Sequence, residues 1–206
     1  MFVVIEVILP VAPEAEITLS LTFNDKVVKN LGFGSNVYKV YNGGSLPYKE
    51  DYYDLIISDS VLEHVDDIEK YYREGARVLK NGGIAKLNFP TRQRLWETHT
   101  RTWIIHYFPR FIRVKLWDIF THQGGVYLEG YLNLRTVRYH ETIAKKYFNV
   151  VINKTKQVIY EKTYIKYGGK VWARSLADKL MHLKIFGPLF VHFFSFFSSC
   201  ELYCKN

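Results

Sequence analysis

A cluster of polar residues in the first half of the chain could carry out acid–base chemistry. Ser58, Asp59 and Ser60 lie at the end of a short apolar run, and Glu63 and His64 follow within a few residues. The imidazole of His64 could take a proton from a hydroxyl group, because the ordinary pKa of histidine, about 6.5, suits a general base near neutral pH. The alternative is that His64 or Glu63 only orients the loop through hydrogen bonds.

A second group of candidates lies in the basic second half of the chain. His99, Arg101 and His106 could bind a substrate, and Arg101 together with Arg110 and Arg113 could hold a phosphate group through paired N–H donors. Aromatic residues alternate with these charges and could stack on a sugar, lie on a membrane surface or fill a core. A solvated basic face is the other interpretation of the same charges.

The elements that position the first cluster show the alternation of an α/β protein. Strands are predicted over 36–41, 54–58 and 84–89, and the run 54–58 is apolar enough to be buried on both faces of a parallel sheet. A helix is predicted from Asp66, which forms a pair resembling a capping box with Glu69, to the Asn-Gly-Gly turn at 81–83. In such sheets ligands bind beyond the carboxyl ends of the strands.

The remaining sequence extends this pattern to a single domain over 1–206. Periodicity fails between 91 and 134, which indicates an inserted aromatic and basic cap over the substrate. The C-terminal part, 135–206, completes the sheet. Its predicted elements are a helix over 136–148, a strand over 149–153, a helix over 177–183 and a last strand over 201–204.

The segment from Leu46 to Val65 resembles the fourth-strand region of class I S-adenosylmethionine-dependent methyltransferases of the type 11-like group. The resemblance continues through Tyr72 to Gly83, which is similar to the helix and glycine turn of that family, and into Phe89 and Pro90. It implies a Rossmann-like open, mostly parallel sheet with flanking helices, S-adenosylmethionine as the cofactor and methyl transfer as the reaction. Residues 1–90 would then be a truncated cofactor-binding half.

The resemblance also assigns roles to individual residues. Asn42 stands where the family usually has an acidic residue that contacts the adenine amino group, and Gly43 follows it; an amide oxygen keeps the acceptor without the charge. Taken alone, Asn42 could equally be an ordinary turn residue. Ser58, Asp59 and Ser60 would lie beside the methionine end of the cofactor. Ser60 replaces an acidic residue with which some relatives bind a divalent ion, so no metal is expected.

Two parts of the family pattern are missing from the N-terminal region. No glycine-rich loop follows the predicted strand over 3–9, and only 10–16 separate it from the next predicted strand over 17–21, whereas a parallel crossover usually needs a dozen or more residues. The acidic residue expected near Leu21 is also absent. The first βαβ unit is therefore predicted to be incomplete. The run 1–9 could cover the resulting sheet edge or mediate dimerisation.

Charge and composition limit the classes of partner. The net charge of +8 divides into −4 over residues 1–90 and +12 over 91–206, so the second half is predicted to meet something anionic or amphiphilic. No zinc-binding or RNA-binding motif accompanies the basic half, and no nucleic-acid partner is expected. The run 185–197 is too short and interrupted to span a bilayer, and the first residues lack the basic start of a signal peptide.

The cysteine spacing points to a reducing compartment. Cys200 and Cys204 would lie on one face of a strand but too far apart to form a disulfide. Cytoplasmic residence is the resulting expectation. The predicted function is methyl transfer to a small polar acceptor, such as a hydroxyl of a glycan or of a lipid-linked sugar. The alternative is a non-catalytic binding or scaffold subunit that docks on a partner or an anionic membrane, and self-association is also considered.

Overall fold

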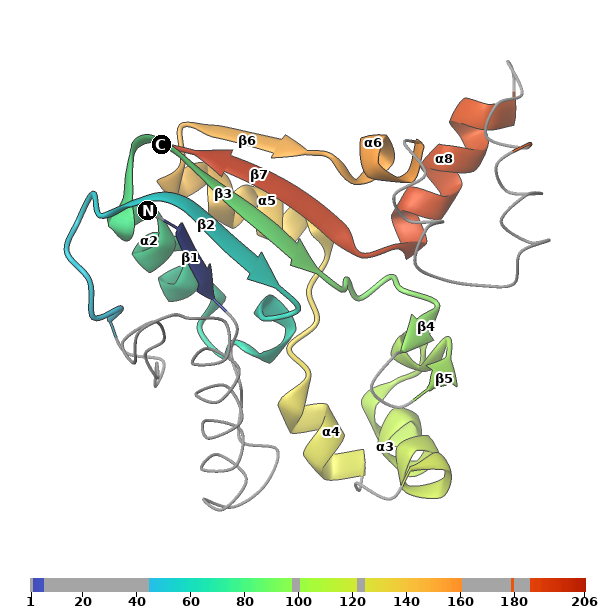
Figure 1. Cartoon of the computed structure of the whole chain (residues 1–206). Helices are drawn as coiled ribbons and strands as arrows, with labels where there is room; N and C mark the ends of the chain where they lie inside the picture. Colours follow the sequence, from blue (N-terminus) through green and yellow to red (C-terminus); the bar gives the residue numbers. More distant parts are fainter. Residues whose placement is uncertain (1, 6–44, 98–100, 122–124, 161–178, 180–185) are drawn as a thin grey trace, which may run out of the picture.

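The strands of the main sheet run mostly in one direction. The computed structural model describes residues 2–5, 45–97, 101–121, 125–160, 179 and 186–206. Within them, five strands form one sheet in the order β1-β2-β3-β7-β6 (Figure 1). β1 is parallel to β2 and β2 to β3, while β7 is antiparallel to both β3 and β6. The strands are β1 (Phe2–Ile5), β2 (Tyr53–Asp59), β3 (Leu79–Phe89), β6 (Val150–Asn153) and β7 (Cys200–Lys205). This confirms the predicted α/β class and the open, mostly parallel sheet.

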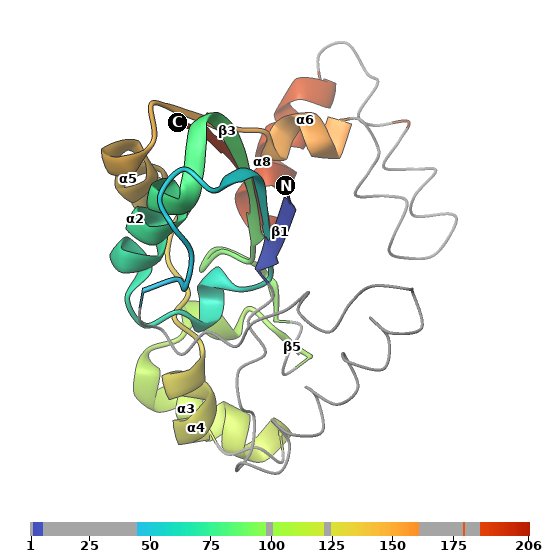
Figure 2. The ribbon, with the colours of Figure 1, turned by 60° about the vertical axis from the view of Figure 1, so that its left-hand side comes forward.

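One face of the sheet packs against two helices, α2 (Ile68–Val78) and α5 (Val137–Tyr147), which lie together on that side (Figure 2). Alternate strand residues face these helices and form the main core, among them Ile56, Ala85 and Leu87, each no more than 3% exposed. Leu55 and Ile57 are only half-buried. β2 is therefore buried by alternation, rather than uniformly along its length as its apolar sequence suggested.

The ends of α2 differ from the prediction. Asp67, not Asp66, is the N-cap, since its carboxylate accepts the backbone N–H of Lys70 at 2.9 Å. The helix ends at Val78, ahead of the predicted glycine turn, and 81–83 lie in an irregular stretch of β3 between its pairings with Tyr53 and Leu55. Asn206 explains the early end, because its side-chain amide donates to the carbonyls of Ala76 and Leu79.

The segment before β2 is fixed to the end of α2 by an ion pair. Arg77 donates to both carboxylate oxygens of Glu74, at 3.0 and 2.8 Å, and to the carbonyls of Leu46 and Tyr48. Glu74 in turn accepts the backbone N–H of Leu46 at 2.8 Å. These hydrogen bonds, first of all that from Arg77, lower the pKa of Glu74.

α5 begins as predicted and packs against α2. Its N-cap is Thr136, whose hydroxyl accepts the backbone N–H of Tyr139. Between the two helices, Glu69 accepts hydrogen bonds from Lys146 and Tyr147, both at 2.9 Å. Glu69 therefore joins α2 to α5 instead of closing a capping box.

The insertion that follows β3 is more regular than its sequence suggested. It lies beyond the carboxyl end of β3 in Figure 1 and has a small core around Ile105 and Trp117. Lack of simple periodicity hid its two helices, because several of their large apolar residues, such as Phe111 and Ile119, are exposed. The elements are β4 (Trp96–Glu97), β5 (Thr102–Trp103), η2 (Ile105–Tyr107), α3 (Arg110–Phe120) and α4 (Gly125–Tyr131).

Two helices lie at the same end of the sheet as the carboxyl end of β3, on the side of β6 and β7 (Figure 1). α6 (Thr155–Tyr160) follows β6, and α8 (Phe186–Phe197) leads into β7; they meet through Ile159 and Val191. No helix in the described ranges is both long and apolar enough to cross a membrane. Cys200 and Cys204 are buried in β7 and not bonded to each other, as predicted. The strands predicted over 17–21 and 36–41 lie outside the described residues, as does the helix over 177–183 except Lys179.

Candidate functional site

The carboxyl ends of β1, β2 and β3 meet at one edge of the sheet. Ile5 pairs with Ser58, Ser58 with Leu87, and Asp59 with Asn88. The residues that follow β2 therefore emerge between two parallel neighbours, where a ligand would reach main-chain and side-chain groups of more than one strand.

Asp59 offers an oriented carboxylate at this edge. Its side chain is exposed, and Oδ1 accepts hydrogen bonds from the Asn88 amide at 2.8 Å and from the Ser60 hydroxyl at 3.2 Å. Both contacts end on the same oxygen, so Oδ2 keeps its capacity to accept from a ligand. The sequence interpretation missed Asn88, although it is a polar residue at the carboxyl end of a strand, the same signal that identified Asp59.

The residues on either side of Asp59 are held by the fold. The Ser58 hydroxyl accepts from the Tyr71 hydroxyl of α2 at 2.7 Å inside the core, so this side chain joins sheet to helix. Ser60 donates its N–H to the Asn88 carbonyl at 2.8 Å and adopts φ of 56°, a left-handed conformation that is costly for a residue with a Cβ. Binding of a cofactor by Ser58 and Ser60 stays a prediction.

Glu63 and His64 lie close together in the short helix η1 (Leu62–His64). His64 Nε2 is 3.8 Å from Glu63 Oε1, and the two side chains are only 7% and 1% exposed. Asn133 holds this turn from the segment between α4 and α5: its N–H donates to the Glu63 carbonyl, and its amide donates to the carbonyls of Val65 and Asp66. A carboxylate beside an imidazole can orient a general base. The role of His64 as that base stays a prediction.

Of the predicted acceptor residues, Arg101 and His106 lie in the described part of the cap, and acceptor binding by them stays a prediction. Arg101 is exposed, with φ of 54°. His106 is 6% exposed, and its Nε2 lies 2.7 Å from Glu97 Oε2, so its imidazole belongs to the cap core. His99 lies outside the described residues, as do the predicted cofactor residues Asn42 and Gly43.

The predicted phosphate site of Arg101, Arg110 and Arg113 is wrong for Arg113. Its guanidinium makes a two-pronged ion pair with the carboxylate of Glu129, with Nε at 2.7 Å from Oε2, and so joins α3 to α4. The carboxylate occupies the donors that a phosphate would need. Arg110 remains exposed at the start of α3.

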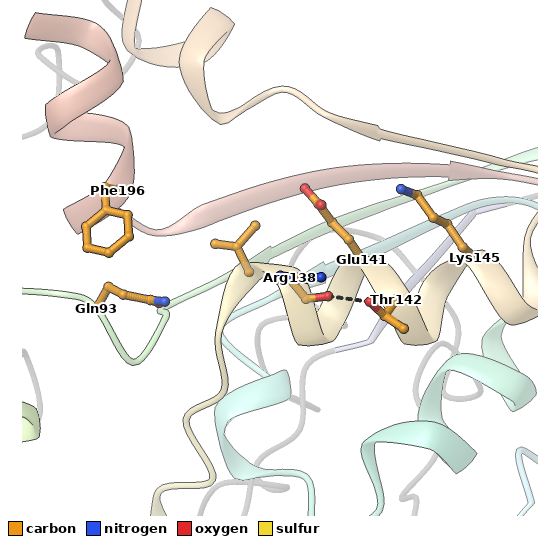
Figure 3. A pocket seen from close by; sticks show the side chains of 7 residues that line it. Gln93, Arg138, Glu141, Thr142, Lys145 and Phe196 are labelled. Carbon is orange, nitrogen blue, oxygen red and sulfur yellow. Dashed lines mark hydrogen bonds between the residues drawn. The ribbon is translucent and has the colours of Figure 1, made fainter. Parts of the chain in front are cut away.

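A cleft of about 520 Å³ lies between α5 and the end of α8 (Figure 3). It is lined by Gln93, by Phe196 of α8 and by five residues of α5: Val137, Arg138, Glu141, Thr142 and Lys145. None of the residues from 58 to 64 lines it. The cleft is therefore separate from the candidate site after β2.

Three solved structures are among those to which the chain is similar. An S-adenosylmethionine-dependent methyltransferase from Mesorhizobium loti has a TM-score of 0.48 at 13% identity, and the match covers 88% of this chain and 75% of that enzyme. The geranyl diphosphate C-methyltransferase of Streptomyces coelicolor, solved with Mg²⁺, geranyl diphosphate and S-adenosyl-L-homocysteine, has a TM-score of 0.47 at 12% identity, and the match covers 90% of this chain and 60% of that enzyme. The [4+2]-cyclase SpnF has a TM-score of 0.46 at 13% identity, and the match covers 91% of this chain and 64% of the cyclase.

At these identities and TM-scores, the solved structures give no information on what this chain binds. The chain spans less than two thirds of the cyclase and of the geranyl diphosphate enzyme. A search of curated proteins finds no significant match.

A model of a protein family, compared with the sequence alone, also matches part of the chain. The family model for the methyltransferase domain matches residues 16–87, a segment that includes β2, η1, α2 and most of β3. The match thus covers the segment from Leu46 to Gly83, which carries most of the resemblance to S-adenosylmethionine-dependent methyltransferases. Residues 16–87, which are less than half of the chain, are therefore similar to the methyltransferase-domain family.

Proposed function

We propose that the protein is an S-adenosylmethionine-dependent methyltransferase that acts on a small polar acceptor. The observation that carries this proposal is the methyltransferase-domain match over 16–87, which contains the oriented carboxylate of Asp59 at the edge shared by β1, β2 and β3. The crevice beyond parallel strand ends is the usual place for a nucleoside cofactor.

The described part of the site fits a cofactor that carries an ammonium group and hydroxyls. Asp59 is exposed, anionic and held in one orientation by Asn88, and one of its oxygens can accept from such donors. Asn42 and Gly43 are proposed to bind the adenine end, and Ser58 and Ser60 to border the methionine end.

When bound, S-adenosylmethionine supplies a methyl group on a positively charged sulfur, which leaves as a neutral thioether. The protein then has mainly to align the acceptor and to exclude water. His64 would take the proton of an acceptor hydroxyl, with Glu63 at 3.8 Å stabilising the resulting imidazolium.

The acceptor, its partners and the location of the protein are proposed from the sequence. The acceptor is a hydroxyl of a glycan, of a lipid-linked sugar or of another small polar molecule, and the cap carries Arg101, His99 and His106 as its candidate contacts. Residence in the cytoplasm, contact with a membrane and self-association are likewise proposed from the sequence.

Calorimetric titration of the full chain with S-adenosylmethionine tests the cofactor. We expect saturable binding that Asp59→Ala abolishes or weakens at least about tenfold, because a charged hydrogen bond contributes about 1.5–3 kcal/mol. Asp54→Ala is the matched control, since Asp54 is an exposed aspartate at the other end of the same strand. Absence of binding, or equal loss in both variants, would contradict the proposal.

Catalysis by His64 has a separate test. Release of S-adenosylhomocysteine is followed with glycan and lipid-linked sugar acceptors for the wild type and His64→Gln. The variant should lose about a hundredfold or more in kcat while it still binds S-adenosylmethionine. Unchanged kcat would show that His64 only orients the loop.

The alternative function is a scaffold subunit that keeps the fold without the chemistry. It is favoured by the lack of a glycine-rich loop in residues 1–21 and by the missing acidic residue near Leu21. The same titration separates the two functions, since a scaffold would show no heat of S-adenosylmethionine binding.

A further inference from the structure

Helix α8 presents an exposed aromatic stripe. Leu189, Phe193 and Phe196 are 64%, 58% and 53% exposed, and their spacing of four and three residues places them on one side of the helix. The opposite side carries Gly187 and Val191, which are buried, Val191 against Ile159 of α6. The helix is therefore docked by one apolar side and exposes another.

The sequence that precedes α8 is strongly basic. α8 itself carries no Asp, Glu, Lys or Arg, whereas residues 154–184, which precede it, carry eight Lys and Arg against two Asp and Glu, a net +6. Lys156, on the neighbouring helix α6, is exposed. An aromatic helix that follows a basic stretch of sequence has the composition of a segment that lies in the interface of an anionic membrane.

The cleft beside the stripe adds cationic side chains at a defined place. Phe196 forms one wall, and exposed Arg138 and Lys145 lie along the opposite wall on α5 (Figure 3). Glu141 between them already accepts a hydrogen bond from Asn153 at 2.8 Å. The two cations can therefore face phosphate oxygens while Phe196 faces the apolar part of the same lipid.

We propose that α8 docks the protein on the surface of an anionic lipid bilayer, with Phe193 and Phe196 at the boundary of the acyl chains and with Arg138 and Lys145 facing lipid phosphates. At twelve residues the helix is far too short to span a bilayer and would lie in its plane. A second copy of the chain is a poorer occupant, because a symmetric contact over this cleft would bring the exposed Arg138 and Lys145 side chains of both copies into one interface. The proposal does not depend on methyltransferase activity.

Co-sedimentation of the full chain with lipid vesicles tests the proposal. We expect binding to vesicles of phosphatidylcholine with about one third phosphatidylserine, little binding to phosphatidylcholine alone, and a decrease at high salt. Phe193→Ser and Phe196→Ser should each lower the partition coefficient about five- to tenfold. Arg138→Gln and Lys145→Gln should each lower it about fivefold.

Matched controls come from the cap. Phe111 is 67% exposed and Lys115 is exposed, both on α3, so Phe111→Ser and Lys115→Gln change the same chemistry elsewhere. Both should bind vesicles like the wild type. Equal losses in the cap variants, equal binding to neutral vesicles, or a dimer in solution that Phe193→Ser dissociates without a change in vesicle binding would each overturn the proposal. Circular dichroism verifies that every variant is folded.

Discussion

His140 should make the protein less stable in mild acid. The side chain is 1% exposed in the core between sheet and helices, with Nδ1 at 3.1 Å from the Tyr72 hydroxyl and the ring 4.2 Å from that of Phe89. Burial, followed by the positive charge of Arg135, lowers the pKa of His140 from 6.5 to about 4. The folded protein therefore keeps this imidazole neutral where the unfolded chain would protonate it.

The sign and size of the effect follow from these two pKa values. Between pH 6.5 and about 4 the unfolded state binds more protons than the folded state, so the free energy of unfolding decreases as the pH falls. The contribution is fully present above pH 6.5 and is lost by about pH 4. The difference in pKa corresponds to about 3 kcal/mol in all, of which about 2 kcal/mol falls between about pH 7 and about pH 5.

Urea unfolding followed by circular dichroism at about pH 7 and about pH 5 measures this difference. His140→Gln keeps a hydrogen-bonding group near Tyr72 but does not titrate, so its loss of stability between the two pH values should be about 2 kcal/mol smaller than that of the wild type. His192→Gln is the control, because His192 is exposed on α8. Equal losses in wild type and His140→Gln would refute the reasoning.

Three other predictions concern stability and thiol reactivity. Arg77→Met should lower the free energy of unfolding, measured in urea, by about 3 kcal/mol because it leaves the 7%-exposed Glu74 without its ion-pair partner. Arg73 is exposed, and Arg73→Met should lower it by less than about 0.5 kcal/mol. Similar losses in the two variants would contradict a stabilising role of the Arg77–Glu74 ion pair. Trp117→Ala should destabilise the cap by about 3–5 kcal/mol. Limited proteolysis of this variant should then cut first within 91–134. Phe120→Ala is the control, because Phe120 is 67% exposed and its loss should not cause early cuts there. Early cuts elsewhere in the Trp117→Ala variant would be inconsistent with a separate cap core. Burial raises the pKa of Cys200 and of Cys204 to about 12, so a disulfide reagent should label them only in urea, and rapid labelling of the native protein would disprove their burial.

The core of the sheet could be predicted from sequence because its signals are local. β2, β6, β7 and α5 lie within one or two residues of their predicted bounds, and Thr136 caps α5. An apolar run of strand length, or an apolar stripe at helical spacing, depends on neighbours within a few positions. The match to the methyltransferase domain over 16–87 rests on the same kind of information.

Predictions that depended on distant residues were less successful. α2 ends early because Asn206, at the other end of the chain, binds its last carbonyls. The helices of the cap were missed because their large apolar residues are divided between a small core and an exposed surface. Neither feature leaves a periodic signal in the sequence.

The sequence by itself determined the α/β class and the place of Asp59 at a strand end, since hydrophobic periodicity and turn residues act over short distances. Only the tertiary structure decided which charged groups are available to a ligand. Arg113 is engaged by Glu129 and His106 by Glu97, whereas Asn88 leaves Asp59 exposed and oriented. The availability of a charged side chain depends on which partner the packed elements bring within hydrogen-bonding distance, and residue type and local spacing carry no record of that partner.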